Sequence, residues 1–253
     1  MKSKFKKVKA DEKTERNSKC WLYTALLTAA AGSAGQAIAG DLHGSIAILS
    51  HYKWAGADQD FYEDKAIFPT LQASLFYGFD NGIYVGNWSS TIKMVDNNRI
   101  DSTAYLGYRS KLGPGVYDIS VGYNFYPGAA YANTTSLYAI YYLQNFSIKW
   151  TGVISKYYVG LPDGRGRQAL ALEGWKNLTE RVVLKGEVGR LFLPDGLKDQ
   201  GLKDKYYFLV GVDYKWRDDM TLGLVYTGAS TVGGPNVGWR NKPRVVASVT
   251  YSF

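Results

Sequence analysis

The chain has 253 residues, enough for one large domain or two small ones, with 30 basic and 22 acidic residues. Eight basic and three acidic residues lie in 1–39, so the remainder carries 22 basic and 19 acidic residues, a net charge of only +3. This small surplus, with no basic helix or zinc-binding pattern, argues against a nucleic-acid partner. The single cysteine, Cys20, lies in the same N-terminal stretch, which excludes disulfides and thiol chemistry from 40–253.

The first 39 residues have the organisation of a cleavable secretory signal peptide. Five lysines between Lys2 and Lys9 make a positive start, 21–31 is apolar, and Ala37-Ile38-Ala39 supplies a small-residue cleavage site. The apolar run is too short for a membrane-spanning helix, which needs about 20 residues. The alternative is a cytosolic N-terminal helix. We predict a signal peptide over 1–39 and a mature domain over 40–253.

The rest of the chain has the periodicity of an all-β protein. The sequence contains 21 Tyr and 28 Gly but only 7 Pro, which suits long strands because Pro interrupts the hydrogen bonding of a sheet. Segments of alternating apolar and polar residues, separated by turn residues, predict twelve strands. In chain order these are 42–53, 70–79, 83–93, 101–110, 116–125, 135–143, 146–157, 168–175, 181–192, 205–216, 221–228 and 244–253.

The connections between these segments alternate in length. Those after even-numbered strands are short, and those after odd-numbered strands are longer, roughly 7 to 15 residues. This alternation is typical of an antiparallel up-and-down transmembrane β-barrel with tight periplasmic turns and long outer loops. Aromatic residues near strand ends, such as Tyr123 and Trp216, suit the membrane interfaces. The alternative is a soluble sandwich with half-buried antiparallel sheets.

One face of the predicted strands is apolar, and in the last strand Val245, Val249 and Tyr251 lie on it. Projecting that face toward lipid leaves five basic and five acidic side chains inside. These pore-lining candidates are Lys93, Asp101, Arg109, Asp118, Lys149, Glu173, Lys185, Glu187, Asp213 and Arg244. Such a balanced lumen should select weakly by charge sign. A twelve-strand bore is compatible both with an open narrow pore and with a closed barrel whose charges pair.

The segment 71–90 resembles the characteristic block of the TorF (Gcw_chp) family of outer-membrane porins, with Gly82, Tyr84, Gly86, Trp88 and Ser90 in its core. The ends of the chain are also similar to the family, at 50–53 and 244–253. Where the family usually shows an Arg-Gly-x-Ser-Gln-like run, this chain has Trp-Ala-Gly-Ala-Asp-Gln over 54–59. The resemblance implies a barrel with a porin role and no particular substrate.

The C-terminal residues also match a general signal for insertion into the outer membrane. Tyr251 and the terminal Phe253 lie on the apolar face of the last strand. We expect the partners of the chain to be outer-membrane lipid, the barrel-insertion machinery and small polar solutes, and its location to be the bacterial outer membrane.

Catalytic and metal-binding patterns are weak. His43 and His51 share one face of the first predicted strand but lie about 26 Å apart at the usual rise, too far to bind one metal together. An acidic group containing Asp58 and Asp60 could bind Ca²⁺, but a solvated outer loop is the favoured interpretation. The run 164–169 matches a nucleotide-binding pattern yet lacks its strand–turn–helix context, so we interpret it as an outer loop. We therefore predict no catalytic residue, metal or cofactor.

Three functional hypotheses follow. The first is a porin-like channel for passive diffusion of small hydrophilic solutes through a narrow, charge-balanced lumen. The second is a closed structural or adhesive barrel whose outer loops bind a surface partner. The third, with the least support from the sequence, is an outer-membrane enzyme.

Overall fold

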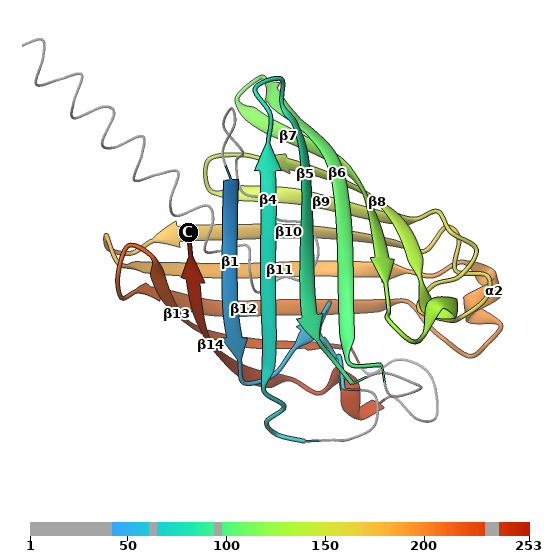
Figure 1. Ribbon diagram of the computed structural model, residues 1–253. Coiled ribbons are helices and arrows are strands. Elements are labelled where there is room, and N and C mark those ends of the chain that lie inside the picture. The colour runs from blue at the N-terminus through green and yellow to red at the C-terminus, as the bar shows by residue number, and fades with distance from the viewer. Residues whose placement is uncertain (1–41, 61–64, 94–97, 231–237) are drawn as a thin grey trace, which may run out of the picture.

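The computed structural model describes residues 42–60, 65–93, 98–230 and 238–253, and within them twelve antiparallel strands close into a barrel (Figure 1). The predicted signal peptide lies outside the described residues. The predicted fold class is confirmed. The barrel strands are β1 (Leu42–Leu49), β4 (Thr70–Gly78), β5 (Ile83–Thr91), β6 (Ile100–Leu112), β7 (Gly115–Phe125), β8 (Thr134–Tyr142), β9 (Phe146–Val153), β10 (Gln168–Asn177), β11 (Val182–Phe192), β12 (Lys205–Lys215), β13 (Met220–Ala229) and β14 (Arg244–Ser252).

Every barrel strand pairs with its neighbour in sequence, and the first and last strands close the ring. In the closing pair β1–β14, Ser45 lies opposite Ser252. Beyond it, Gly44 N donates to Phe253 O at 2.9 Å and Phe253 N donates to Gly44 O at 3.0 Å. A Cβ on Gly44 would lie 2.3 Å from the Phe253 ring, so the absence of a side chain lets the terminal aromatic ring cover the seam.

The predicted alternation of connections is confirmed. Segments 79–82, 113–114, 143–145, 178–181 and 216–219 join strands at one end of the barrel, called here the turn end. The longer connections lie at the opposite loop end and include the short helices η2 (Ala130–Ala132), α2 (Asp195–Lys198) and η3 (Gly238–Asn241). None of the described helices has the length and apolar character needed to span a bilayer.

The polarity of the barrel is the reverse of that of a soluble protein. Large apolar side chains such as Ile119, Val210 and Leu224 are exposed on the outer face, while Asp118 and Lys185 are buried inside. Soluble domains almost never surround buried charges with a continuous apolar outer surface. This polarity is that of a transmembrane barrel, so the soluble-sandwich alternative is wrong and the chain is an outer-membrane β-barrel.

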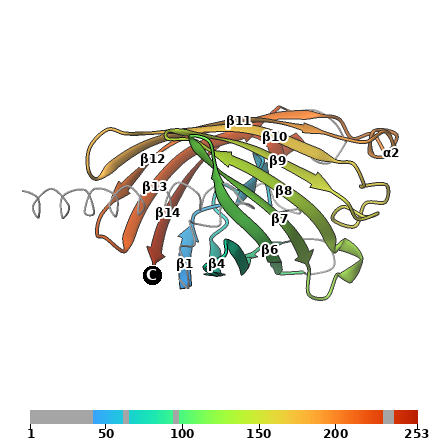
Figure 2. The ribbon, with the colours of Figure 1, turned by 90° about the horizontal axis from the view of Figure 1, so that it is seen from above.

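The first long connection departs from the sequence prediction. The first strand ends at Leu49 rather than at residue 53, and the chain then forms a hairpin of β2 (Lys53–Trp54) and β3 (Ala57–Asp58). This inner hairpin lies between the walls of the barrel (Figure 2). Asp58 and Asp60 are 0% and 1% exposed, so their interpretation as part of a solvated outer loop is wrong.

The turn of the inner hairpin fixes its position. Ala55 and Gly56 have φ values of 45° and 71°, the positive pair required by the tight turns that match strand twist. A Cβ on Gly56 would lie 2.2 Å from the Gly228 carbonyl oxygen, so the turn rests directly on the backbone of β13. Only glycine meets both requirements, the left-handed φ and the close approach.

The lipid-facing position of Ile119 gives a test of membrane embedding. Ile119 is 54% exposed near the middle of β7, so Ile119→Arg should destabilise the barrel by about 2–4 kcal/mol in lipid vesicles. Urea unfolding, with Ile119→Phe as the apolar control, measures the loss. A change below about 0.5 kcal/mol, as expected at a water-exposed site, would contradict a lipid contact.

Candidate functional site: the barrel lumen

Three groups of paired charges occupy the lumen toward the turn end. In the first, Arg109 forms an ion pair with Asp118, the residue directly opposite it across β6–β7. Tyr84 donates from its hydroxyl to the other Asp118 oxygen at 2.7 Å. The guanidinium also lies 5.5 Å from the centre of the Tyr142 ring. Side chains from four adjacent strands, β5 to β8, thus surround the buried Asp118 carboxylate and its ion pair.

The second and third groups lie on the opposite wall. Glu173 and Glu187 are directly opposite each other on β10 and β11, a destabilising arrangement for like charges. Lys149 on β9 lies 2.9 Å from Glu173 and 2.8 Å from Glu187, and so bridges them. Lys185 on β11 donates to both oxygens of Asp213 on β12 at 2.7 Å. These side chains form a polar layer, called here the turn-end layer.

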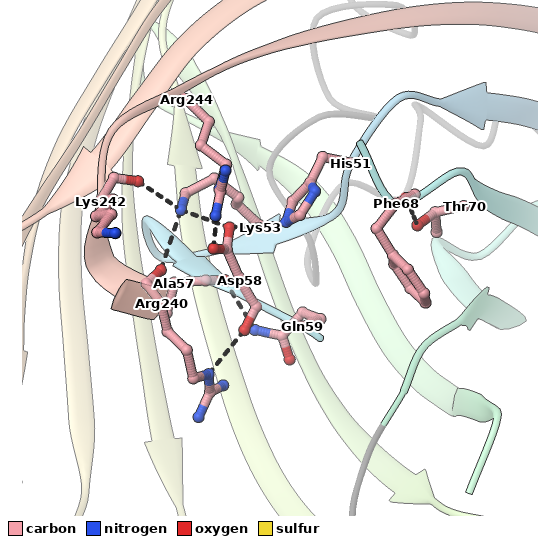
Figure 3. A network of polar contacts seen from close by, with 10 residues as sticks. All are labelled: His51, Lys53, Ala57, Asp58, Gln59, Phe68, Thr70, Arg240, Lys242 and Arg244. Atoms are coloured by element: carbon pink, nitrogen blue, oxygen red, sulfur yellow. Dashed lines mark hydrogen bonds and ion pairs between the residues drawn. The ribbon is translucent and has the colours of Figure 1, made fainter. Parts of the chain in front are cut away.

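At the loop end, Asp58 of the inner hairpin is the centre of a second network (Figure 3). Its Oδ1 accepts from Lys53 Nζ at 2.7 Å and lies 2.9 Å from His51 Nε2. Its Oδ2 accepts from Arg244 Nε of β14 at 3.0 Å, and its backbone oxygen accepts from Arg240 Nε at 3.0 Å. This Asp58 network joins the inner hairpin to the beginning of the last strand.

The electrostatics of the Asp58 network favour the docked state. Burial on its own raises the pKa of Asp58, but hydrogen bonds from His51 and Lys53 outweigh it and hold the pKa below its usual value. Burial lowers the pKa of Lys53, against the opposing effect of the Asp58 carboxylate. Each charge therefore depends on its partner to remain ionised in the interior.

Aromatic side chains from β5 to β8 line the wall facing the inner hairpin. Trp88 packs edge-on against Tyr52, with ring centres 5.7 Å apart, and Tyr105 packs edge-on against Tyr138 at 5.6 Å. Trp54 of the hairpin packs against this cluster. On its other side, the Arg167 guanidinium lies 4.4 Å from the centre of the Trp54 ring and 4.2 Å from that of Tyr158.

Trp54 lies between two small chambers in the lumen. The loop-side chamber and the turn-side chamber each have a volume of about 50 Å³, and Trp54, Tyr138 and Thr151 line both. The turn-side chamber ends at Lys149 and Glu187, whereas the loop-side chamber contains Asp101 and Arg167. A volume of this size holds a few water molecules, because one water needs about 10–15 Å³ measured in this way.

The ten pore-lining candidates fall into two sets along the barrel axis. Lys93, Asp101 and Arg244 lie at the loop end, where Lys93 forms a β-bridge with Asp60. The other seven make up the turn-end layer. Asp101, Arg109, Asp118, Glu173, Lys185, Glu187 and Asp213 are buried, while Lys149 and Arg244 are largely so. Their lining of a conducting path stays a prediction.

The proposed insertion signal lies on the outer face. Tyr251 and Phe253 are both exposed, with ring centres 5.9 Å apart. They lie at the turn end, next to the seam between β1 and β14. Recognition of these rings by an insertion machinery stays a prediction.

The inward positions of the inner-hairpin residues and of Arg167 do not follow from the sequence pattern. The pattern predicts an outer loop for Trp54 and Asp58, and the local signal for a tight turn is the pair Ala55-Gly56. Arg167 belongs to the run 164–169, which does precede a strand at the loop end, but its side chain points inward and is 1% exposed. Within the described ranges, no group of three His, Cys, Asp or Glu side chains is arranged to bind a metal ion.

Comparison with protein families and solved structures agrees with this architecture. The family model described as "Bacterial protein of unknown function (Gcw_chp)" matches residues 33–253. The chain belongs to the Gcw_chp family. Comparison with curated proteins finds no match for this Gcw_chp chain.

Solved structures similar to the Gcw_chp barrel include outer-membrane channels. The KdgM porin is 11% identical, with 83% of this chain and 99% of that chain covered at a TM-score of 0.53, which shows a shared fold. The COG4313 outer membrane channel from Pseudomonas putida F1 is 12% identical, with 88% and 100% covered at 0.47. The Omp33 outer membrane protein of Acinetobacter baumannii is 9% identical, with 86% and 100% covered at 0.48.

The Lys185–Asp213 pair tests whether the turn-end layer of the Gcw_chp barrel is dry. Lys185→Met should destabilise the barrel by about 3–5 kcal/mol, because it leaves the buried Asp213 carboxylate without its main partner. The double variant Lys185→Met with Asp213→Leu should recover most of that loss. Urea unfolding in detergent micelles compares the three proteins. A loss below about 1 kcal/mol in the single variant would mean that Asp213 is well hydrated.

Proposed function

We propose that this barrel is a porin-like channel for passive diffusion of small hydrophilic solutes, with the inner hairpin as its constriction. The observation that carries the proposal is the charged interior of a closed twelve-strand barrel, with Trp54 in the walls of two chambers. A barrel of this size is wide enough to hold more than its own side chains. Here the additional space is taken by a segment that is not part of the wall.

Displacement of the inner hairpin would join the two chambers. The hairpin is held by the Asp58 network, by the stacking of Trp54 on Arg167 and by the close contact of Gly56 with the backbone of β13. Against these contacts acts the left-handed conformation of Ala55, which costs an L-residue about 1–2 kcal/mol. A hairpin held by a few polar contacts and opposed by local strain suits a reversible constriction.

The distribution of charge suits weak selection by sign at the turn end. Arg109, Lys149 and Lys185 face four carboxylates, and each cation lies within 3 Å of a carboxylate oxygen. Paired charges present little net field to a passing ion while still attracting water. The overall balance of five basic and five acidic candidates therefore remains part of the proposal.

Two further parts of the proposal concern assembly. Residues 1–39 act as a cleaved signal peptide, and 40–253 form the mature barrel in contact with outer-membrane lipid. The exposed rings of Tyr251 and Phe253 are the part of the last strand that the barrel-insertion machinery binds.

A closed structural or adhesive barrel is the second candidate. The observation that favours it is the small size of the two chambers, about 50 Å³ each, which admits water but no sugar. Liposome swelling separates the two candidates, because a closed barrel lets no sugar enter the vesicle. The solved structures described above are porins and channels, which weighs against the third candidate, an enzyme.

Planar-bilayer recording tests the channel directly. The purified barrel should give discrete conductance steps in potassium chloride, and Asp58→Asn should increase the open fraction by at least about 100-fold. The reason is that loss of a buried ion-pair partner costs about 3–5 kcal/mol, and each 1.4 kcal/mol is a factor of ten.

The matched control is Asp219→Asn, since Asp219 forms an exposed pair with Arg217 at the turn end, worth at most about 1 kcal/mol. It should conduct like the unaltered protein. Absence of conductance at every voltage in both the unaltered protein and Asp58→Asn would refute the channel.

Two neighbouring substitutions in the hairpin turn should act in opposite directions. Gly56→Val adds atoms where even a Cβ lies 2.2 Å from the Gly228 oxygen, so the hairpin should leave the wall and conductance should rise. Ala55→Gly removes the cost of the left-handed conformation, so conductance should be unchanged or lower. Single-channel recording of the two variants side by side measures this. Equal conductance in both would show that the hairpin is not the constriction.

A further inference from the structure

Arg167 is a buried cation without a polar partner. It directly precedes β10, is 1% exposed, and its Nε and Nη2 atoms have no hydrogen-bond partner among the described residues. The Trp54 and Tyr158 rings both lie against its guanidinium, with their centres 4.4 and 4.2 Å away. A buried Arg normally directs its in-plane donors at a carboxylate or carbonyl group, so this arrangement leaves strong donors unused.

The surroundings of Arg167 are rich in basic side chains. Lys205, the first residue of β12, lies within electrostatic range of Arg167, Arg240 and Lys53. The Asp58 carboxylate already accepts from Lys53 and Arg244. A buried group of like charges is costly, and binding an anion would reduce that cost.

The loop-side chamber beside Arg167 has the remaining features of a site for a small hydroxylated solute. Asn124, Gln59 and Ser136 supply polar groups, and Tyr52 and Trp88 supply aromatic surface. Asp101 lines the same chamber, with Asn124 Nδ2 3.5 Å from its Oδ1, so it can accept from a hydroxyl. A carboxylate in this position would disfavour a second negative charge on the solute.

We propose that Arg167 is the recognition residue for the carboxylate of a small hydroxycarboxylate solute in the loop-side chamber. The two nitrogens without a partner, Nε and Nη2, lie on one edge of the planar guanidinium, the geometry that binds a carboxylate in bidentate fashion. The inference names the solute class of the proposed channel and in that sense rests on the proposed function. The binding site itself requires only the folded barrel.

Binding must be linked to movement of Trp54. The chamber of about 50 Å³ is too small for a hydroxycarboxylate of six carbons, and Trp54 forms part of its wall. The solute therefore displaces Trp54, and part of its binding free energy is used to move the inner hairpin. Removal of the Trp54 ring should then raise the affinity for the solute.

The experiment uses the folded barrel in detergent micelles, without a membrane. Isothermal titration calorimetry with sodium gluconate and with sorbitol, its neutral analogue, compares the unaltered protein with Arg167→Gln at low ionic strength. The unaltered protein should bind gluconate and not sorbitol, and Arg167→Gln should lose at least tenfold in gluconate affinity. Arg165→Gln is the matched control, since Arg165 lies in the same loop with its side chain exposed. Its affinity should be unchanged.

A second variant keeps the proposal open to refutation if Arg167→Gln does not fold, as judged by heat-modifiable migration on a gel. Trp54→Ala should bind gluconate at least tenfold more tightly than the unaltered protein. Equal binding of gluconate and sorbitol, equal loss in Arg165→Gln, or no gain in Trp54→Ala would overturn the proposal. A barrel that binds gluconate but never conducts refutes the channel alone, and one that conducts without binding gluconate refutes the site alone.

Discussion

The need to pair every backbone amide in lipid governs the rest of this structure. An open sheet would leave edge amides without partners in the hydrocarbon, so the twelve strands must close, and the closure through Gly44 and Phe253 completes the ring. Closure sends alternate side chains outward to lipid and inward to the bore. Because the outward side chains are apolar, the polar side chains face the bore and lie close to one another. Each buried charge therefore needs a partner within the bore.

The two polar regions of the lumen meet that need in different ways. In the turn-end layer, partners such as Arg109 and Asp118 come from adjacent strands of the wall, so the barrel itself fixes their distance. At the loop end, Asp58 comes from an inserted segment and its partner Arg244 from β14, 186 positions further along the chain. The first arrangement is as rigid as the barrel, whereas the second exists only while the inner hairpin is docked.

The sequence predicted well what depends on local alternation and poorly what depends on contacts across the bore. Strand periodicity and loop lengths were sufficient for twelve strands, and the inward position of Asp118 and Asp213 follows from the same period of two. The inner hairpin was missed because 50–53 continues the alternation of β1, and nothing near Asp58 in sequence indicates its pairing with Arg244. Arg167 was missed because loop residues beside glycines are usually exposed, and only the Trp54 and Tyr158 rings explain its burial.

The turn-end layer and the Asp58 network would behave differently during the proposed gating. In the proposed channel, a change at the Asp58 network would move Trp54, which lies between the two chambers, without altering any pair of the turn-end layer. The hydrogen-bonded strand pairs of the wall would then stay intact when the hairpin moves. Because Trp54 also lies against Arg167, the same movement would expose the Arg167 guanidinium to a solute in the bore. The proposed opening and the proposed solute recognition would therefore both depend on the position of the Trp54 ring.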